Sequence, residues 1–188
     1  MELVATSSPP SCTAFAGTRR LASGSGEEVA PVVAATLATD PAAQVLVFDD
    51  ATGRQIDLDL GPVRPQPTAE PRRGPGRPRL GVVAREVTLL PRHWEWLNGQ
   101  PGGASVALRR LVDEARKTRA AADRLRQARA AADRFMMALA GDRPGYEEAA
   151  RALYAGDGAR FARLTADWPA DVRDHARSLA APAFVTLP

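Results

Sequence analysis

One stretch of the sequence limits what the whole chain can fold into. Residues 61–81 combine glycines and arginines with six prolines: Pro62, Pro65, Pro67, Pro71, Pro75 and Pro78. Proline lacks a backbone N–H and fixes φ, so a tract this dense cannot form a helix or a central strand. The tract is therefore predicted to be an extended basic linker that separates two folding units.

The sequence before the linker predicts a small α/β unit over residues 13–60. Residues 1–12 are rich in serine and proline and are predicted to be disordered. The alternation of apolar and polar residues predicts strands, and apolar residues at helical spacing predict a helix. The expected elements are a strand or hairpin over 13–22, a helix over 27–39 with Pro31 in its first turn, a strand over 44–48 and, after a turn at 49–53, a second strand over 55–60 that completes a hairpin.

The sequence after the linker predicts one strand followed by helices. In residues 82–117 we expect a short strand, Arg85 to Leu90, and two short helices separated by Pro101-Gly102-Gly103. Residues 118–188 are predicted to be helical. They begin with an amphipathic helix that is either separate from the preceding one or continuous with it, and shorter helices are expected over 146–155, over 158–166 and after Pro169. The fold class is predicted to be α+β.

Charge is distributed unevenly along the chain. Residues 1–60 carry 3 basic and 8 acidic groups, residues 61–130 carry 15 and 6, and residues 131–188 carry 7 and 8. The middle block therefore has a net charge of +9 between two acidic flanks. Such a block is typical of a segment that contacts a polyanion, since phosphate contacts dominate affinity for nucleic acid.

The residue types present argue against several kinds of site. A single cysteine and two histidines cannot form a disulfide or a Cys/His zinc site within one chain. The acidic residues near position 50 favour a structural turn over a calcium or magnesium loop, because their spacing departs from that of an EF-hand. No phosphate-binding loop or nucleophile motif occurs. We expect a cytoplasmic, non-enzymatic protein that has no cofactor and no membrane span.

The basic arm within the linker resembles a known DNA-binding motif. Gly76-Arg77-Pro78, with Arg72 and Arg73 before it and Arg79 after it, is similar to an AT-hook. The resemblance implies an extended arm in the minor groove of A·T-rich DNA, where proline keeps the backbone extended and arginines enter the negative potential. The alternative is a solvated basic linker.

Residues 86–97 resemble the strand and first helix of ribbon-helix-helix repressors. The resemblance implies that two chains pair their strands and place the ribbon in the major groove, so a homodimer is expected. With Val87 and Leu89 directed inward, Thr88 faces a base; the opposite register exchanges the two faces. Trp94 and Leu97 are expected in the core. Trp96 is expected at a dimer seam or against the N-terminal unit.

The start of the second predicted helix is a candidate phosphate site. In the ribbon-helix-helix fold this helix N-terminus directs backbone N–H groups at a DNA phosphate. Gly103 and Ser105 occupy that position here, with Ser105 as the expected cap, and a plain inter-helix turn explains the glycine pair equally well. The residues expected to bind DNA are Arg72, Arg73, Arg77, Arg79, Arg85, Thr88, Arg92, Gly103, Ser105 and Arg109.

Most of the chain is also similar to an uncharacterised bacterial family, catalogued as a domain of unknown function. The similarity includes Val47-Phe48-Asp49-Asp50, the segment 76–97 and Asp167-Trp168-Pro169. It implies no activity. From the residues alone we expect a transcriptional regulator that binds duplex DNA as a homodimer. The alternative is an antitoxin-like adaptor that binds a protein partner through its N-terminal unit or its C-terminal helices; an enzyme is less favoured.

Overall fold

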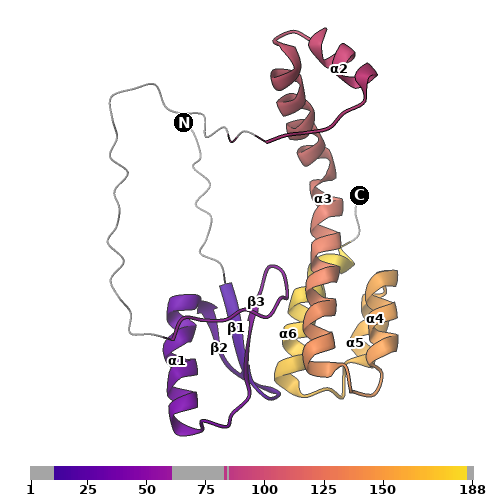
Figure 1. The fold of residues 1–188 in the computed structure, drawn as a ribbon. Helices are drawn as coiled ribbons and strands as arrows, with labels where there is room; N and C mark the ends of the chain where they lie inside the picture. The colour runs from indigo at the N-terminus through magenta and orange to yellow at the C-terminus, as the bar shows by residue number, and fades with distance from the viewer. Residues whose placement is uncertain (1–10, 61–82, 84, 186–188) are drawn as a thin grey trace, which may run out of the picture. The chain divides into compact units, whose positions relative to one another are not determined.

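The computed structural model describes residues 11–60, 83 and 85–185. The chain divides into two compact units. Unit 1 combines residues 1–61 with residues 120–188, and unit 2 consists of residues 62–119. The α+β fold class is confirmed, since a small antiparallel sheet near the N-terminus is followed by helices (Figure 1). Residues 13–60 and 120–188, which lie on opposite sides of the linker in sequence, thus belong to the same compact unit.

The sheet of unit 1 has three antiparallel strands in the order β2-β1-β3. They are β1 (Ser11–Ala16), β2 (Arg19–Ser25) and β3 (Val45–Asp49). The first two form the expected hairpin, and Gly17 supplies the positive φ of +56° that its tight turn needs. The hairpin begins earlier than predicted. Ser11 and Cys12 were predicted to belong to a disordered segment over 1–12, but they are residues of β1.

The strand predicted over residues 55–60 does not form. Only Gln55 makes an isolated bridge, to Phe48, and the chain then leaves the sheet. Ile56 and Leu58 nevertheless pack against the cluster that contains Cys12 and Val47. Their apolar side chains are therefore partly buried without a hydrogen-bonded ladder, which is why alternation alone gave the wrong prediction for this segment.

Helix α1 (Gly26–Thr39) covers one face of the sheet. It begins with a capping box, in which Ser25 Oγ accepts from the Glu28 backbone N–H and the Glu28 carboxylate accepts from the Ser25 backbone N–H. The helix was predicted over 27–39 with Pro31 in its first turn, but it begins at Gly26, so Pro31 lies in its second turn. Val29 and Val33 point into the cluster that they form with Cys12, Ala14 and Val47.

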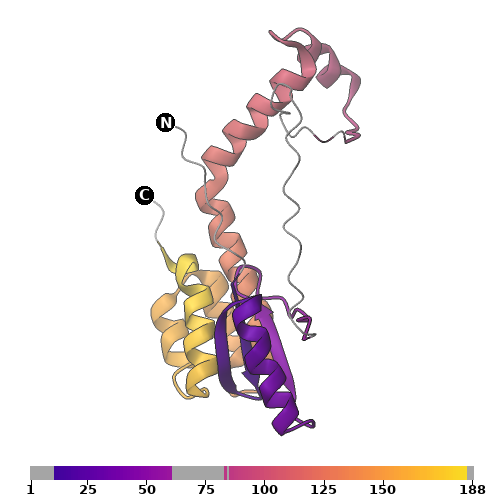
Figure 2. The same cartoon turned by 90° about the vertical axis from the view of Figure 1, so that its left-hand side faces the viewer.

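The other face of the sheet is covered by helices from the C-terminal part of unit 1. Phe15 and Phe48 alternate with residues of the α1 cluster, so they face the opposite side. There they meet Phe135, with ring centroids 5.3 and 5.1 Å away, respectively. Figure 1 shows the strands between α1 and these helices, and Figure 2 shows α1 in front of the strands. The central strand β1 is thus buried on both faces.

After the sheet the chain forms α2 (Pro91–Asn98), and five further helical segments follow it. They are α3 (Gly103–Ala140), α4 (Tyr146–Ala155), α5 (Gly158–Leu164), α6 (Ala170–Ala180) and the 3-10 helix η1 (Ala181–Phe184). The second short helix predicted in residues 82–117 is not a separate element. It is the first part of the 38-residue helix α3, as the continuous alternative required. The helix predicted over 146–155 is confirmed.

Unit 2 contains α2 and the first part of α3. Residues 85–90 form no strand within the single chain. The predicted strand needs the same segment of a second chain as its hydrogen-bonding partner, so it stays a prediction. Gly102 and Gly103 both adopt positive φ, +84° and +74°, in the turn between the helices. Trp94, predicted in the core, is exposed, whereas Leu97 is buried.

None of the helices in the described ranges combines the length and the apolar character that crossing a membrane requires.

Gly53 fixes the approach of the turn after β3 to helix α3. Its φ is +64°, and a Cβ built at this position would lie 2.0 Å from the backbone oxygen of Ala131. We expect Gly53→Ala to lower the free energy of unfolding by about 3 kcal/mol or more, because the clash with helix backbone adds to the cost of positive φ. Chemical denaturation measures this difference.

Gly17→Ala is the matched control for that substitution. Gly17 has a similar φ of +56°, but a Cβ there meets nothing within 4 Å. The control isolates the backbone term and should cost about 1 to 2 kcal/mol. Equal losses for the two variants would show that the contact with Ala131 does not constrain the fold.

Candidate functional site

A cleft lined by polar and charged side chains lies within unit 1. It has a volume of about 540 Å³, which is within the range of roughly 300–1,000 Å³ typical of small-molecule sites. The sheet contributes residues of β1 and β2, the turn after β3 contributes two more, and α3, α6 and η1 close the other sides. The lining residues are Thr13, Arg20, Ser23, Asp50, Ala51, Arg124, Gln127, Ala128, Ala131, Asp174, His175, Ser178, Leu179 and Pro182.

Asp50 is the centre of a polar network in this cleft. Thr13 Oγ1 donates to Asp50 Oδ1 over 2.8 Å and Ser11 Oγ donates to Oδ2 over 2.6 Å. Thr13 Oγ1 also lies 3.0 Å from Ser23 Oγ on the neighbouring strand. Because the backbone N–H of Asp50 donates to the carbonyl of Ser11, the carboxylate is held directly at the end of β1.

The preceding residue, Asp49, has a structural role. Its Oδ1 accepts from the backbone N–H and from the hydroxyl of Thr52, each over 2.7 Å, and this closes the turn after β3. The sequence-based preference for a turn at these acidic residues is consistent with this geometry. No group of three His, Cys, Asp or Glu side chains within the described ranges is arranged to hold a metal ion.

His175 of α6 is the second buried polar group of the cleft. Only 7% of its surface is exposed, and its ring packs edge-on against Phe15 and Phe135, with centroids 5.4 and 4.6 Å away. Nε2 lies 3.5 Å from Asp50 Oδ1 and makes no hydrogen bond. Burial lowers the pKa of His175, Asp50 opposes this shift, and Arg20 adds to it. The imidazole is therefore neutral at neutral pH.

Two arginines line the cleft where it opens to solvent. Arg20 of β2 and Arg124 of α3 are exposed, and within the described residues neither side chain forms an ion pair with a carboxylate. Asp174, in contrast, is paired with Arg173 over 2.7 Å, and this hydrogen bond lowers the pKa of its carboxyl group. The mouth of the cleft therefore has two cations whose side chains form no ion pair within the described residues, although the Asp171 carboxylate accepts from the backbone N–H of Arg20 over 2.8 Å.

Cys12 lies beside this network but cannot take part in its chemistry. The thiol is buried on the α1 side of the sheet. Burial raises its pKa, and the charges of Asp50 and Asp49 raise it further. A thiol with a raised pKa is a poor nucleophile at neutral pH.

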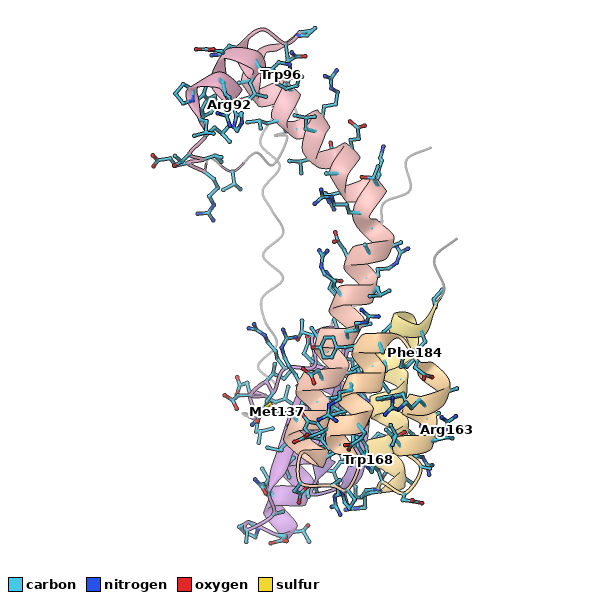
Figure 3. The ribbon with its side chains drawn as sticks, turned by 90° about the vertical axis from the view of Figure 1, so that its right-hand side faces the viewer. Arg92, Trp96, Met137, Arg163, Trp168 and Phe184 are labelled. Atoms are coloured by element: carbon cyan, nitrogen blue, oxygen red, sulfur yellow. The ribbon has the colours of Figure 1, made fainter. Side chains whose placement is uncertain are left out.

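The residues that the sequence assigns to DNA binding lie in two groups. Arg72, Arg73, Arg77 and Arg79 fall outside the described residues. The others belong to unit 2, where Arg85, Thr88, Arg92 and Arg109 are exposed. Figure 3 shows Arg92 and Trp96 projecting from α2.

The predicted role of Ser105 as a helix cap is wrong. Helix α3 begins at Gly103, so Ser105 already lies inside the first turn. Its backbone carbonyl accepts from Nε of Arg109, one turn later, over 3.1 Å. The glycine pair with positive φ makes the inter-helix turn and so allows α3 to start two residues earlier than the serine.

Unit 2 has almost no core of its own. Of its described residues only Leu97 and Ala107 are buried. Large apolar side chains are exposed on three successive segments: Val87 and Leu90 before α2, Trp94 and Trp96 on α2, and Val106, Leu111 and Val112 on α3. Exposed apolar side chains gathered in so small a unit are typical of a surface that another chain covers.

Sequence reasoning missed the Asp50–His175 pair. Asp50 was considered only as part of a turn, and His175 only as a residue of the last helix. A usable signal was present, because His175 shares the apolar face of α6 with Val172, Ala176 and Leu179 at helical spacing. A histidine on such a face is buried, and it then needs a polar neighbour, which only the fold identifies.

Protonation of His175 should make folding stability depend on pH. The unfolded histidine, with a pKa of about 6.5, binds a proton at higher pH than the folded one. Its contribution is therefore complete above that value and is lost as pH falls toward the lower folded-state pKa, by at most about 1.4 kcal/mol per pH unit. We expect His175→Gln to reduce the loss of stability between pH 7.5 and 5.5, measured by denaturant unfolding.

His93→Gln, at an exposed histidine of α2, is the control and should behave like the wild type. If the free energy of unfolding changes with pH equally in all three proteins, the assignment to His175 is contradicted.

Comparison with known proteins gives one match. A family described as "Uncharacterized protein conserved in bacteria (DUF2239)" matches residues 11–180, which include both strands of the hairpin, every lining residue of the cleft except Pro182, and the described part of unit 2. No curated protein and no solved structure matches the chain. Since the match spans most of the sequence, the chain belongs to this uncharacterised bacterial family.

Proposed function

We propose that the protein binds duplex DNA as a homodimer through unit 2 and acts in the cytoplasm as a transcriptional regulator without enzymatic activity. The observation that carries the proposal is the exposure of apolar side chains in a unit that buries only two of its described residues, Leu97 and Ala107. So small a core cannot stabilise a folding unit alone. A second copy would cover the exposed side chains.

The apolar stripe of α3 supports this arrangement. Leu108, Leu111, Val112 and Ala115 recur at helical spacing, and Val112 is 54% exposed. Val87 is 53% exposed in the segment before α2. In a ribbon-helix-helix dimer the segments 85–90 of two chains would pair with each other, which supplies the hydrogen-bonding partner that the single chain lacks. The same association would bury Val87 and the stripe.

Charge supports DNA as the partner of this dimer. Residues 62–119 carry 12 basic and 5 acidic groups, a net charge of +7, whereas the rest of the chain carries 13 and 17, a net charge of −4. Dimerisation doubles the positive charge on one assembly. A cationic surface of this kind attracts the phosphate backbone, and the exposed Arg85, Arg92 and Arg109 are available for contacts.

The dimer is tested at Val112. Val112→Asp places a charge on the exposed stripe, so it should raise the dimer dissociation constant at least about tenfold in analytical ultracentrifugation, because a buried unpaired carboxylate is costly. Met137→Asp is the matched control, since Met137 lies on the same helix and is exposed but belongs to unit 1 (Figure 3). A wild-type protein that is monomeric at high concentration would reject the dimer and favour the alternative, an adaptor that binds another protein.

DNA binding is tested by fluorescence anisotropy with a labelled duplex over a series of salt concentrations. Affinity should fall steeply as salt rises, and Arg92→Ala combined with Arg109→Ala should weaken binding about tenfold and reduce the salt slope by about 2. Arg160→Ala combined with Arg163→Ala removes two exposed arginines of α5 in unit 1 and should leave affinity unchanged.

The arm is tested separately in the same assay. Arg77→Ala combined with Arg79→Ala should weaken binding if these residues enter the minor groove. Unchanged affinity would reject the arm but leave binding by unit 2 intact. Equal losses for the unit 2 pair and the α5 pair would show that the protein binds DNA without a defined surface.

A further inference from the structure

We propose that the cleft of unit 1 binds a small organic phosphate, whose phosphate group is held by Arg20 and Arg124. This site lies in a different unit from the DNA-binding surface, and the inference does not depend on it. Three properties of the cleft carry the argument: two cations at its mouth whose side chains form no ion pair within the described residues, polar groups already fixed in its interior, and a volume that suits a small metabolite.

Two arginines supply positive charge at the mouth of the cleft. Arg20 and Arg124 come from β2 and α3, and no carboxylate in the described residues forms an ion pair with either. The two acidic residues of the cleft are already engaged, Asp174 by Arg173 and Asp50 by two hydroxyl groups. Both carboxylates keep their charge, but neither forms an ion pair with Arg20 or Arg124, so the two guanidinium groups can contact an anionic ligand.

The shape of a guanidinium group suits a phosphate group. A guanidinium group matches the oxygens of a phosphate with two parallel hydrogen bonds, and a phosphate monoester has enough oxygens for two arginines. Its charge, close to −2 at neutral pH, balances two cations. A monocarboxylate would leave one arginine unpaired, so the pair favours the dianion.

The other lining residues of the cleft suit the organic part of the ligand. Beyond the arginines, the cleft presents the hydroxyl groups of Ser23 and Ser178, the amide of Gln127 and the apolar side chains of Leu179 and Pro182. Hydroxyls and an amide can bind the hydroxyl groups of a sugar, and the apolar residues can contact its carbon skeleton. A sugar phosphate or a nucleoside monophosphate has both parts.

His175 and Asp50 form the polar floor of the cleft. His175 is more than nine-tenths buried, lines the cleft, and its Nε2 makes no hydrogen bond in the protein. Asp50, 24% exposed at its side chain, is held rigidly by Thr13 and Ser11. A preorganised polar floor of this kind binds a ligand at little entropic cost, because its side chains are already ordered.

The test is isothermal titration of the full-length protein, without DNA, at constant ionic strength. The probes are inorganic phosphate, glucose 6-phosphate and adenosine 5′-monophosphate, with glucose and adenosine as uncharged counterparts. We expect at least one phosphate ester to bind at least about tenfold more tightly than both its uncharged counterpart and inorganic phosphate.

Variants then assign the binding to the cleft. Arg20→Ala combined with Arg124→Ala should weaken binding of that ester about tenfold or more, whereas Arg160→Ala combined with Arg163→Ala should leave it unchanged. Both arginines of the cleft are exposed, so the variant should fold, which circular dichroism checks. Failure of all three phosphate probes at millimolar concentration, or equal binding by the two double variants, would overturn the proposal.

A DNA arm of the experiment separates the two sources of phosphate. The Arg20 and Arg124 double variant should bind duplex DNA within about twofold of the wild-type affinity. If its DNA affinity falls while no small phosphate binds, the two arginines belong to a surface for nucleic acid and the cleft is not a ligand site.

Discussion

Burial of both faces of β1, the central strand of the sheet, is the constraint on which the rest of unit 1 depends. A strand buried on one side only can alternate apolar and polar residues, but here Cys12, Thr13, Ala14 and Phe15 are all buried. Odd and even positions serve two different clusters, one under α1 and one under the C-terminal helices. The aromatic contact of Phe15 and Phe48 with Phe135 therefore joins segments separated by the whole of unit 2, and it places His175 beside Asp50.

The two units satisfy the hydrophobic requirement in different ways. Unit 1 buries Phe15, Phe48 and Phe135 within one chain, whereas unit 2 leaves two tryptophans and the apolar stripe of α3 exposed. The same helix, α3, serves both: Phe135 and Met136 are fully buried, while Val112 is exposed. Amphipathic character is thus continuous along α3, but only one part of its apolar side is covered by the chain itself.

Local patterns were sufficient to predict much of the fold. Alternation, capping residues and helical spacing identified the β1–β2 hairpin, α1, β3 and α4, because in each of these segments the local preference agrees with the tertiary environment. The strand predicted over 55–60 failed because Ile56 and Leu58 are partly buried without a ladder. The strand predicted over 85–90 stays a prediction, because its partner would be a second chain. The separate second helix failed because no residue between Arg116 and Ala121 interrupts α3.

The cleft was beyond sequence reasoning for a different reason. Its residues come from four regions of the chain, and only long-range packing brings Thr13, Asp50, Arg124 and His175 to one place. Each taken alone has an ordinary structural explanation: a strand threonine, a turn aspartate, a helix arginine and an apolar-face histidine. The signals for DNA binding, by contrast, are compositional and local, so the sequence presents them without any knowledge of the fold.

The discontinuity of unit 1 has a consequence for how the protein is made. During translation residues 11–60 leave the ribosome before the helices that cover Phe15 and Phe48, which follow only after residue 120. Until then the nascent sheet has one uncovered aromatic face, and closing the unit requires a loop of 58 residues to bring its two parts together. Premature termination within unit 2 would therefore release a fragment with an exposed apolar surface, which chaperones and proteases recognise.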